Sequence, residues 1–124
     1  MSATTFGRRL VVDYLTGTGL WMALFTSDPG LSGSLLGEVS GGGYARVSLD
    51  GLMTAADSGG ISTNTEALNF GPATDDWGTV RFVGFMDAET GGNLILPGSP
   101  AVPKTVTAGL PFQIAIGRLR LRAI

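Results

Sequence analysis

The fold of this chain is decided at residues 20–26, which run Leu-Trp-Met-Ala-Leu-Phe-Thr. An unbroken apolar run of this length, bounded by turn residues, predicts a β-strand that is buried on both faces. A turn follows at once, because residues 27–30 are Ser-Asp-Pro-Gly and each of these residue types favours a turn. The run therefore predicts a buried strand with a sharp end.

Further strand segments follow along the chain. Residues 31–43 and 53–66 are rich in small and polar residues and predict loops, and residues 87–93 predict a hairpin connection. Prolines at positions 97, 100 and 103 restrict that stretch to a sheet edge or a loop. We expect about seven short strands, at residues 20–26, 44–49, 67–70, 78–86, 94–96, around 106 and at 110–122.

The last of these strands changes phase. Its apolar residues fall on even positions as far as Ile116 and on odd positions from Leu119 onward. A strand alternates with period two, so both sets face inward only where one extra residue is inserted. We predict a β-bulge at Gly117–Arg118, with Ile116 and Leu119 both inward.

The one helix that the sequence predicts lies at the N-terminus. Phe6, Leu10 and Tyr14 are spaced by four residues and form an apolar stripe. Thr4 or Thr5 is suited to cap the start of this helix, and Gly17 is suited to end it. A helix of about a dozen residues is marginal alone. We therefore expect it to pack through its stripe onto its own sheet or onto a neighbouring subunit.

Length and composition set the fold class. The chain has 124 residues, of which 44% are apolar, and this is enough for one domain with one core. With the strand count, it predicts a mainly β protein with a single-domain antiparallel β-sandwich, jelly-roll-like, and one short N-terminal α-helix. The expected division is a helix or arm at residues 1–18 and the β-sandwich domain at residues 19–124.

Several functional classes are excluded by what the sequence lacks. The absence of Cys and His excludes a disulfide framework, the usual zinc site, a Cys nucleophile and a Ser-His-Asp triad. The net charge of −2 argues against a nucleic-acid tract, and no apolar stretch is long enough to span a membrane. Only three apolar residues separate Arg9 from Asp13, so no signal peptide is predicted. We expect the chain to act in a cytoplasm or in a particle assembled there.

The remaining polar residues do not form a catalytic pattern. Asp75 and Asp76 are adjacent and would point apart in an extended segment, so a solvated turn explains them better than an acid–base pair. A calcium site is the alternative for this pair. The glycine clusters at residues 17–19 and 41–43 lack the endings of nucleotide-binding loops. We therefore predict no enzyme activity, no catalytic residue, no cofactor and no metal.

Arginine and aromatic side chains are the candidates for contacts with other proteins. Arg118, Arg120 and Arg122 alternate near the C-terminus and are expected to share one outer strand face. A solvated face is the simplest explanation for them, followed by a protein interface and then by nucleic acid. Trp77 is a core residue or an interface anchor in preference to a sugar platform. The predicted interface set is Phe6, Leu10, Tyr14, Trp77, Arg118, Arg120 and Arg122.

Several motifs occur in a distinctive order. They include Met-Ala-Leu-Phe-Thr-Ser-Asp-Pro at residues 22–29, Gly-Gly-Gly-Tyr-Ala-Arg at 41–46 and Asp-Trp-Gly-Thr-Val at 76–80. In this order and spacing, residues 20–116 resemble a family of small tailed-bacteriophage virion proteins, usually described as tail-fibre-like or minor structural proteins. The resemblance implies a virion component without catalytic residues. The N-terminal helix and the Arg-rich C-terminus depart from it.

The resemblance implies a non-enzymatic structural protein of a phage particle, assembled in the cytoplasm of a bacterial host. Such a protein would bind capsid or tail proteins in a decoration, fibre-attachment or minor tail role. Its expected partners are other virion proteins and copies of itself, with a trimer favoured, and neither nucleic acid nor a membrane. The alternative is a receptor- or carbohydrate-binding fibre module. A glycan hydrolase would need two facing carboxylates about 5–10 Å apart.

Overall fold

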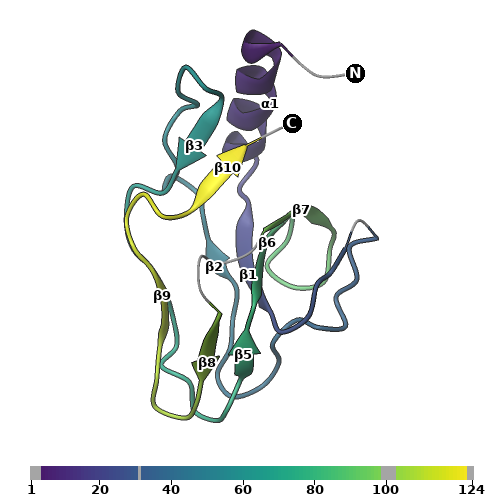
Figure 1. Ribbon diagram of the computed structural model, residues 1–124, viewed down its shortest axis with the longest axis vertical. Coiled ribbons are helices and arrows are strands. Elements are labelled where there is room, and N and C mark those ends of the chain that lie inside the picture. The colour runs from purple at the N-terminus through teal and green to yellow at the C-terminus, as the bar shows by residue number, and fades with distance from the viewer. Residues whose placement is uncertain (1–3, 31, 99–102, 123–124) are drawn as a thin grey trace. The chain divides into compact units, whose positions relative to one another are not determined.

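The computed structural model describes residues 4–30, 32–98 and 103–122 (Figure 1), and for Thr5, Pro97, Gly98 and Arg122 it describes the backbone only. Within these residues the chain forms one helix, α1 (Thr5–Gly17), and ten short strands in antiparallel sheets. The expected class, mainly β and antiparallel with one short N-terminal helix, is confirmed. The strands are β1 (Trp21–Phe25), β2 (Val47–Ser48), β3 (Ile61–Thr63), β4 (Leu68–Phe70), β5 (Gly78–Val80), β6 (Phe82–Met86), β7 (Leu94–Gly98), β8 (Lys104–Val106), β9 (Phe112–Ile114) and β10 (Arg120–Arg122).

Two compact units make up the chain, and each draws on separate stretches of the sequence. Unit 1 contains the residues up to Leu20, Leu49–Leu68 and the residues from Ile114 onward. Unit 2 contains Trp21–Ser48 and Asn69–Gln113. The helix therefore belongs to the same unit as the C-terminal strand.

Unit 2 is organised around a four-stranded antiparallel sheet with the strand order β2-β1-β6-β7. β1 lies between β2 and β6, and its residues from Met22 to Phe25 are completely buried, which confirms the predicted strand with two buried faces. The predicted hairpin at residues 87–93 joins β6 to β7. β7 is an edge strand, and this position suits Pro97 because proline has no N–H for a second neighbouring strand.

Unit 1 combines α1 with the two-stranded sheet of β3 and β10, and Figure 1 shows the helix beside these strands. The Thr4 side chain caps the helix by accepting a hydrogen bond of 3.0 Å from the Gly7 N–H. The helix ends at Gly17, as predicted. Val12 is its fully buried side chain, and it joins Leu20, Leu49, Leu68 and Leu121 among the buried residues of this unit.

The prediction of a continuous loop at residues 53–66 is wrong, because β3 lies within it. Arg120, Leu121 and Arg122 of β10 pair with residues 63, 62 and 61 of this segment. Small polar residues such as Ser62 carry little local strand signal. Pairing with a distant strand, together with complete burial of Ser62, makes this segment a strand.

The predicted phase change in the last strand occurs at Gly117, but its form differs from a bulge. Residues 115–118 make a turn between two separate strands, with a hydrogen bond of 3.1 Å from the Arg118 N–H to the Ala115 carbonyl. β9 pairs with β4, whereas β10 pairs with β3. Leu119 is inward as expected, but the prediction for Ile116 is wrong, since this side chain is 66% exposed. The apolar residues of β9 and those of β10 can therefore face inward in different phases, because each strand pairs with a different partner strand.

Asn64 fixes this turn from inside unit 1. Its side-chain N–H₂ donates to the carbonyls of Glu66 (2.8 Å) and Ala115 (3.0 Å), and its side-chain oxygen accepts from the Leu119 N–H (3.0 Å). Asn64 is 1% exposed, and these three hydrogen bonds satisfy its buried side-chain amide. The side chain replaces the strand pairing that the turn interrupts.

A search of the described segments for a helix with the length and apolar character of a membrane span finds none.

Candidate functional site

Helix α1 presents three large apolar side chains to solvent, and we call them the apolar ridge. They are Phe6, Leu10 and Tyr14, with exposed fractions of 63%, 59% and 73%. Of the two expected contacts of these side chains, docking onto the chain's own sheet is wrong, and docking onto a neighbouring subunit stays a prediction. At 100° per residue, Val12 lies on the opposite side of the helix from Leu10, and the fully buried Val12 faces unit 1 instead.

The helix that carries the ridge is tied to the rest of unit 1. The Asp13 carboxylate accepts a hydrogen bond of 2.7 Å from the Ala56 N–H. Helix α1 also contacts β3 and β10. The ridge therefore stands on an anchored helix and not on a loose arm.

The C-terminal arginines are only partly placed. Arg118 lies in the turn before β10 and Arg120 lies within β10, and both are exposed. The side chain of Arg122 lies outside the described residues. Arg118 and Arg120 are thus available to a partner, and their role in an interface stays a prediction.

Trp77 is a core residue of unit 2. It is 5% exposed, its indole N–H donates to the Gly42 carbonyl at 2.9 Å, and its ring meets the Tyr44 ring edge-on at a centroid distance of 5.6 Å. Gly42 has φ 57°, and a Cβ atom there would lie 2.9 Å from the indole nitrogen. Trp77 therefore belongs among core residues and is not placed to anchor a partner.

A buried ion pair lies beside this aromatic cluster. The Arg46 guanidinium binds the Glu38 carboxylate with two parallel hydrogen bonds of 2.8 Å, from Nε to Oε2 and from Nη2 to Oε1. Its Nη1 donates to the carbonyls of Ala88 and Gly91, both at 2.8 Å. The Tyr44 hydroxyl donates to Glu38 Oε2 at 2.7 Å and accepts from the Leu24 N–H at 3.0 Å. One arginine thus connects residue 38 to the hairpin at 87–93.

The electrostatics of this network match its geometry. Burial raises the pKa of Glu38, but hydrogen bonds from Arg46 and Tyr44 outweigh burial and hold that pKa below the ordinary 4.5. Hydrogen bonding to Glu38 raises the pKa of Arg46. Burial raises the pKa of the Tyr44 hydroxyl far above its ordinary value, so this group remains a donor at neutral pH. Glu38 and Arg46 are therefore both charged at neutral pH, and the hydrogen bonds that they make hold parts of unit 2 together.

This network was missed by sequence reasoning, which identified Tyr44 and Arg46 only as part of the motif at residues 41–46 and gave Glu38 no role. Tyr44, Arg46 and Trp77 belong to the motifs that carry the family resemblance, yet all three lie in the interior of unit 2. The motifs therefore specify the fold of this unit and do not mark a binding site.

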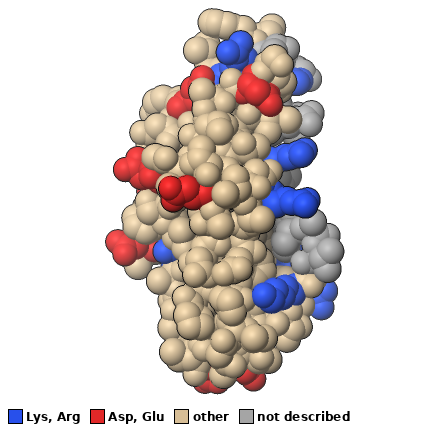
Figure 2. Space-filling view, turned by 90° about the vertical axis from the view of Figure 1, so that its left-hand side faces the viewer, with Lys and Arg blue, Asp and Glu red and all other residues tan. Residues whose placement is uncertain are grey.

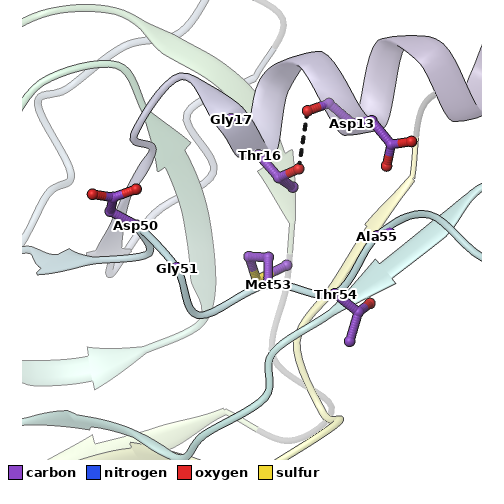
Figure 3. Close-up of a pocket in the computed structure, with 8 residues that line it drawn as sticks. All are labelled: Asp13, Thr16, Gly17, Asp50, Gly51, Met53, Thr54 and Ala55. Carbon is purple, nitrogen blue, oxygen red and sulfur yellow. Dashed lines mark hydrogen bonds between the residues drawn. The ribbon is translucent and has the colours of Figure 1, made fainter.

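A shallow pocket of 390 Å³ lies between α1 and residues 50–55 of unit 1 (Figure 3). Its two carboxylates, Asp13 and Asp50, lie at opposite ends in the close-up and do not face each other. Asp13 is already engaged with the Ala56 N–H. The pocket therefore lacks the facing pair that acid–base hydrolysis of a glycan uses.

Charged groups are sparse on the surface as well as in the sequence. Figure 2 shows one face of the molecule, on which uncharged side chains cover most of the area. Among the residues with described positions, no group of three or more acidic side chains is placed to hold a metal ion. Among the described residues, the apolar ridge is the exposed feature that most clearly offers a contact to another protein.

The comparison with protein families gives one match. The family model described as podophage GP4 fiber I protein gp80 matches residues 9–122. The matched range includes most of α1 and all of β10, so the similarity extends further than the motifs in residues 20–116 indicate. No curated protein matches the chain.

Proposed function

The chain belongs to the podophage GP4 fiber I protein gp80 family, which makes it a fibre-like structural protein of a tailed-phage virion, and we propose that it works there by binding other virion proteins. In this proposal it is assembled in the host cytoplasm and acts without catalysis. Its contacts are with capsid or tail proteins and with further copies of itself. Decoration, fibre attachment and a minor tail role are the three forms that this binding can take.

The apolar ridge on α1 is the single observation that carries the proposal. Three large apolar side chains of one helix, each more than half exposed, form a continuous patch and are not scattered exceptions. Val12 and Asp13 anchor the same helix to unit 1, so the backbone that carries the ridge is fixed before any partner binds. Burial of such side chains is the usual source of affinity between structural proteins.

Incorporation into particles tests this proposal. Phage lacking the gene would be complemented with tagged protein, and the tag would be quantified in purified virions. Replacing Phe6, Leu10 and Tyr14 together by Ser should reduce incorporation at least tenfold, because the apolar contact is lost while the fold is kept. Leu36→Ser is the matched control, since Leu36 is a 96% exposed leucine outside the ridge. Normal incorporation of the ridge variant would contradict the proposal.

The alternative, a receptor- or carbohydrate-binding module, has less support from the described surface. Neither tryptophan offers an exposed ring as a sugar platform, because Trp77 is buried and Trp21 packs against the core cluster of Ala23, Phe25 and Met86. The exposed aromatic rings Phe6 and Tyr14 belong to the apolar ridge. Binding of the purified protein to host cells, retained in the ridge variant, would favour this alternative.

A further inference from the structure

We propose that strand β10 binds an extended acidic segment of another virion protein, which pairs as an added β-strand along the outer edge of β10. This inference rests on the proposed structural role and specifies the chemistry of one partner. It is carried by the hydrogen bonds that fix which backbone groups point outward, by the open edge that results and by the arginines beside it.

Strand β3 uses alternate residues for its two neighbours. In an antiparallel pair, the N–H and C=O groups of successive residues point to opposite sides of the strand. The carbonyls of Ile61 and Thr63 accept hydrogen bonds from the N–H groups of Asp57 (2.9 Å) and Thr54 (2.8 Å), on the side away from β10. Ser62, between them, therefore points its N–H and C=O groups toward β10.

The same alternation leaves the outer edge of β10 open. Leu121 lies opposite Ser62, so its N–H and C=O groups point to β3. Those of Arg120 and Arg122, on either side of it, point outward. Among the described residues, β10 pairs with β3 alone, and no other backbone group bonds to these outward groups. The edge thus offers two donors and two acceptors with the spacing that a further strand requires.

The side chains at this edge are basic. Leu121 is buried and Arg120 is exposed, since successive side chains of a strand lie on opposite faces. Arg118 is exposed in the turn before the strand. Within β3, the residue opposite Arg120 is the uncharged Thr63. In the described part of the chain the one ion pair is the buried pair in unit 2, so neither Arg118 nor Arg120 is paired with a carboxylate.

These charges select the partner. A strand added to the outer edge places one of its residues directly opposite Arg120, where opposite charges stabilise the pairing and like charges destabilise it. A second copy that paired in antiparallel fashion through its own β10 would place arginine opposite arginine, because Arg118, Arg120 and Arg122 alternate. The edge therefore disfavours a second copy and favours an extended segment with Asp or Glu at every second position.

Binding of a synthetic strand to the purified full-length protein tests the proposal. The probe is the end-blocked peptide Thr-Glu-Val-Glu-Val-Glu-Thr, and titration calorimetry measures its binding. Affinity should fall about fivefold between about 50 and about 300 mM NaCl, because salt screens exposed charges. Arg120→Glu should weaken binding about tenfold. Arg81→Glu is the matched control and should bind as the wild type does, since Arg81 is an exposed arginine of unit 2. Circular dichroism would establish that both variants are folded.

Two methylated probes separate strand addition from attraction between charges alone. The residue opposite Arg120 bonds to it through its own N–H and C=O groups, and in this proposal that residue is a Glu. N-methylation of the Glu residues should therefore abolish binding, whereas N-methylation of the Val residues leaves the pairing edge intact and should preserve it. Hydrogen exchange at the Arg120 and Arg122 N–H groups should become slower in the complex with the unmethylated probe.

Four outcomes would overturn the proposal. They are no binding of the probe at low salt, equal binding by the Arg120→Glu and Arg81→Glu proteins, equal binding of the two methylated probes, and unchanged exchange at Arg120 and Arg122. The first would show that the arginines only protect a solvated edge. None of them affects the proposed virion role, which is read from incorporation of the ridge variant into particles.

Discussion

Arg46 makes four hydrogen bonds, two to the Glu38 carboxylate and two to carbonyls of the hairpin at 87–93. Lysine keeps the charge but has no planar fork, so Arg46→Lys should lower the free energy of unfolding by about 2 kcal/mol. Arg46→Met leaves a half-buried carboxylate without its cation, and the expected loss is about 3–5 kcal/mol. Urea denaturation followed by tryptophan fluorescence measures both. Losses below about 0.5 kcal/mol would show that the pair contributes little.

The same network predicts a dependence on pH. The pKa of Glu38 is lower in the folded than in the unfolded chain, whose value is the ordinary 4.5. The folded state therefore binds fewer protons, and the stabilisation is complete above pH 4.5 and is lost as the pH falls through the lowered pKa. Glu38→Gln should be less stable at pH 7 and should lose this part of the acid dependence. Glu89→Gln removes an equal charge from an exposed position and serves as the control.

For single residues, the sequence can show that a side chain belongs to a motif, but it does not show which groups that side chain binds. Tyr44 and Arg46 stand out within a motif, but the carbonyls that Arg46 binds lie 42 and 45 residues further on. A pairing over that distance has no period and no spacing that local reasoning can detect. Asn64 is a similar case, because its bond to the Ala115 carbonyl spans 51 residues.

Among the elements, the turn at residues 115–118 gives the clearest prediction. Gly117 has φ 76°, and a Cβ atom added there would have no atom within 4 Å. Gly117→Ala should therefore lower the free energy of unfolding by about 1 kcal/mol through backbone strain alone. Gly17, at the end of α1, also has open space around it but no positive φ, so Gly17→Ala should be neutral or slightly stabilising. Equal effects of the two substitutions in thermal unfolding would contradict this interpretation.

The elements also show what periodicity can predict. Thr4 and Gly17 bound the helix as expected, because caps and stops are local signals. Phe6, Leu10 and Tyr14 do share one face of the helix, as predicted, but they are exposed. An apolar stripe shows which side chains share a face and does not show what covers that face. Val12, outside the stripe, makes the buried contact instead. Likewise, the phase change located Gly117 but did not show that β9 and β10 have different partner strands.

On the scale of the whole molecule, each unit is assembled from stretches that are far apart in the sequence. Unit 1 joins the N-terminal helix, Leu49–Leu68 and the C-terminal strand. Composition and strand counting predict a class of fold and treat residues 19–124 as one domain. They carry no information on which distant segments meet, since each strand here is short and its pairing is non-local.

The independence of residues 19–124 from the helix stays a prediction, and deletion of residues 1–16 tests it. The deletion removes the buried Val12 and the Asp13 carboxylate that binds the Ala56 N–H, both within unit 1. Hydrogen exchange in β3 and β10 should therefore become faster. Both tryptophans lie in unit 2, so their emission spectrum should stay as in the intact chain. Assembly should be impaired more than the folding of unit 2, because the apolar ridge is lost with the helix.

A second variant separates loss of the helix from loss of its packing. Val12→Ala keeps the ridge and the helix but removes two buried methyl groups, which should destabilise unit 1 by about 2 kcal/mol. It should accelerate exchange in β3 and β10 less than the deletion does, and it should leave self-association unchanged. A red-shifted tryptophan emission in the deletion variant would mean that unit 2 needs the helix in order to fold. Unchanged exchange in β3 and β10 would mean that α1 serves contacts with other molecules alone.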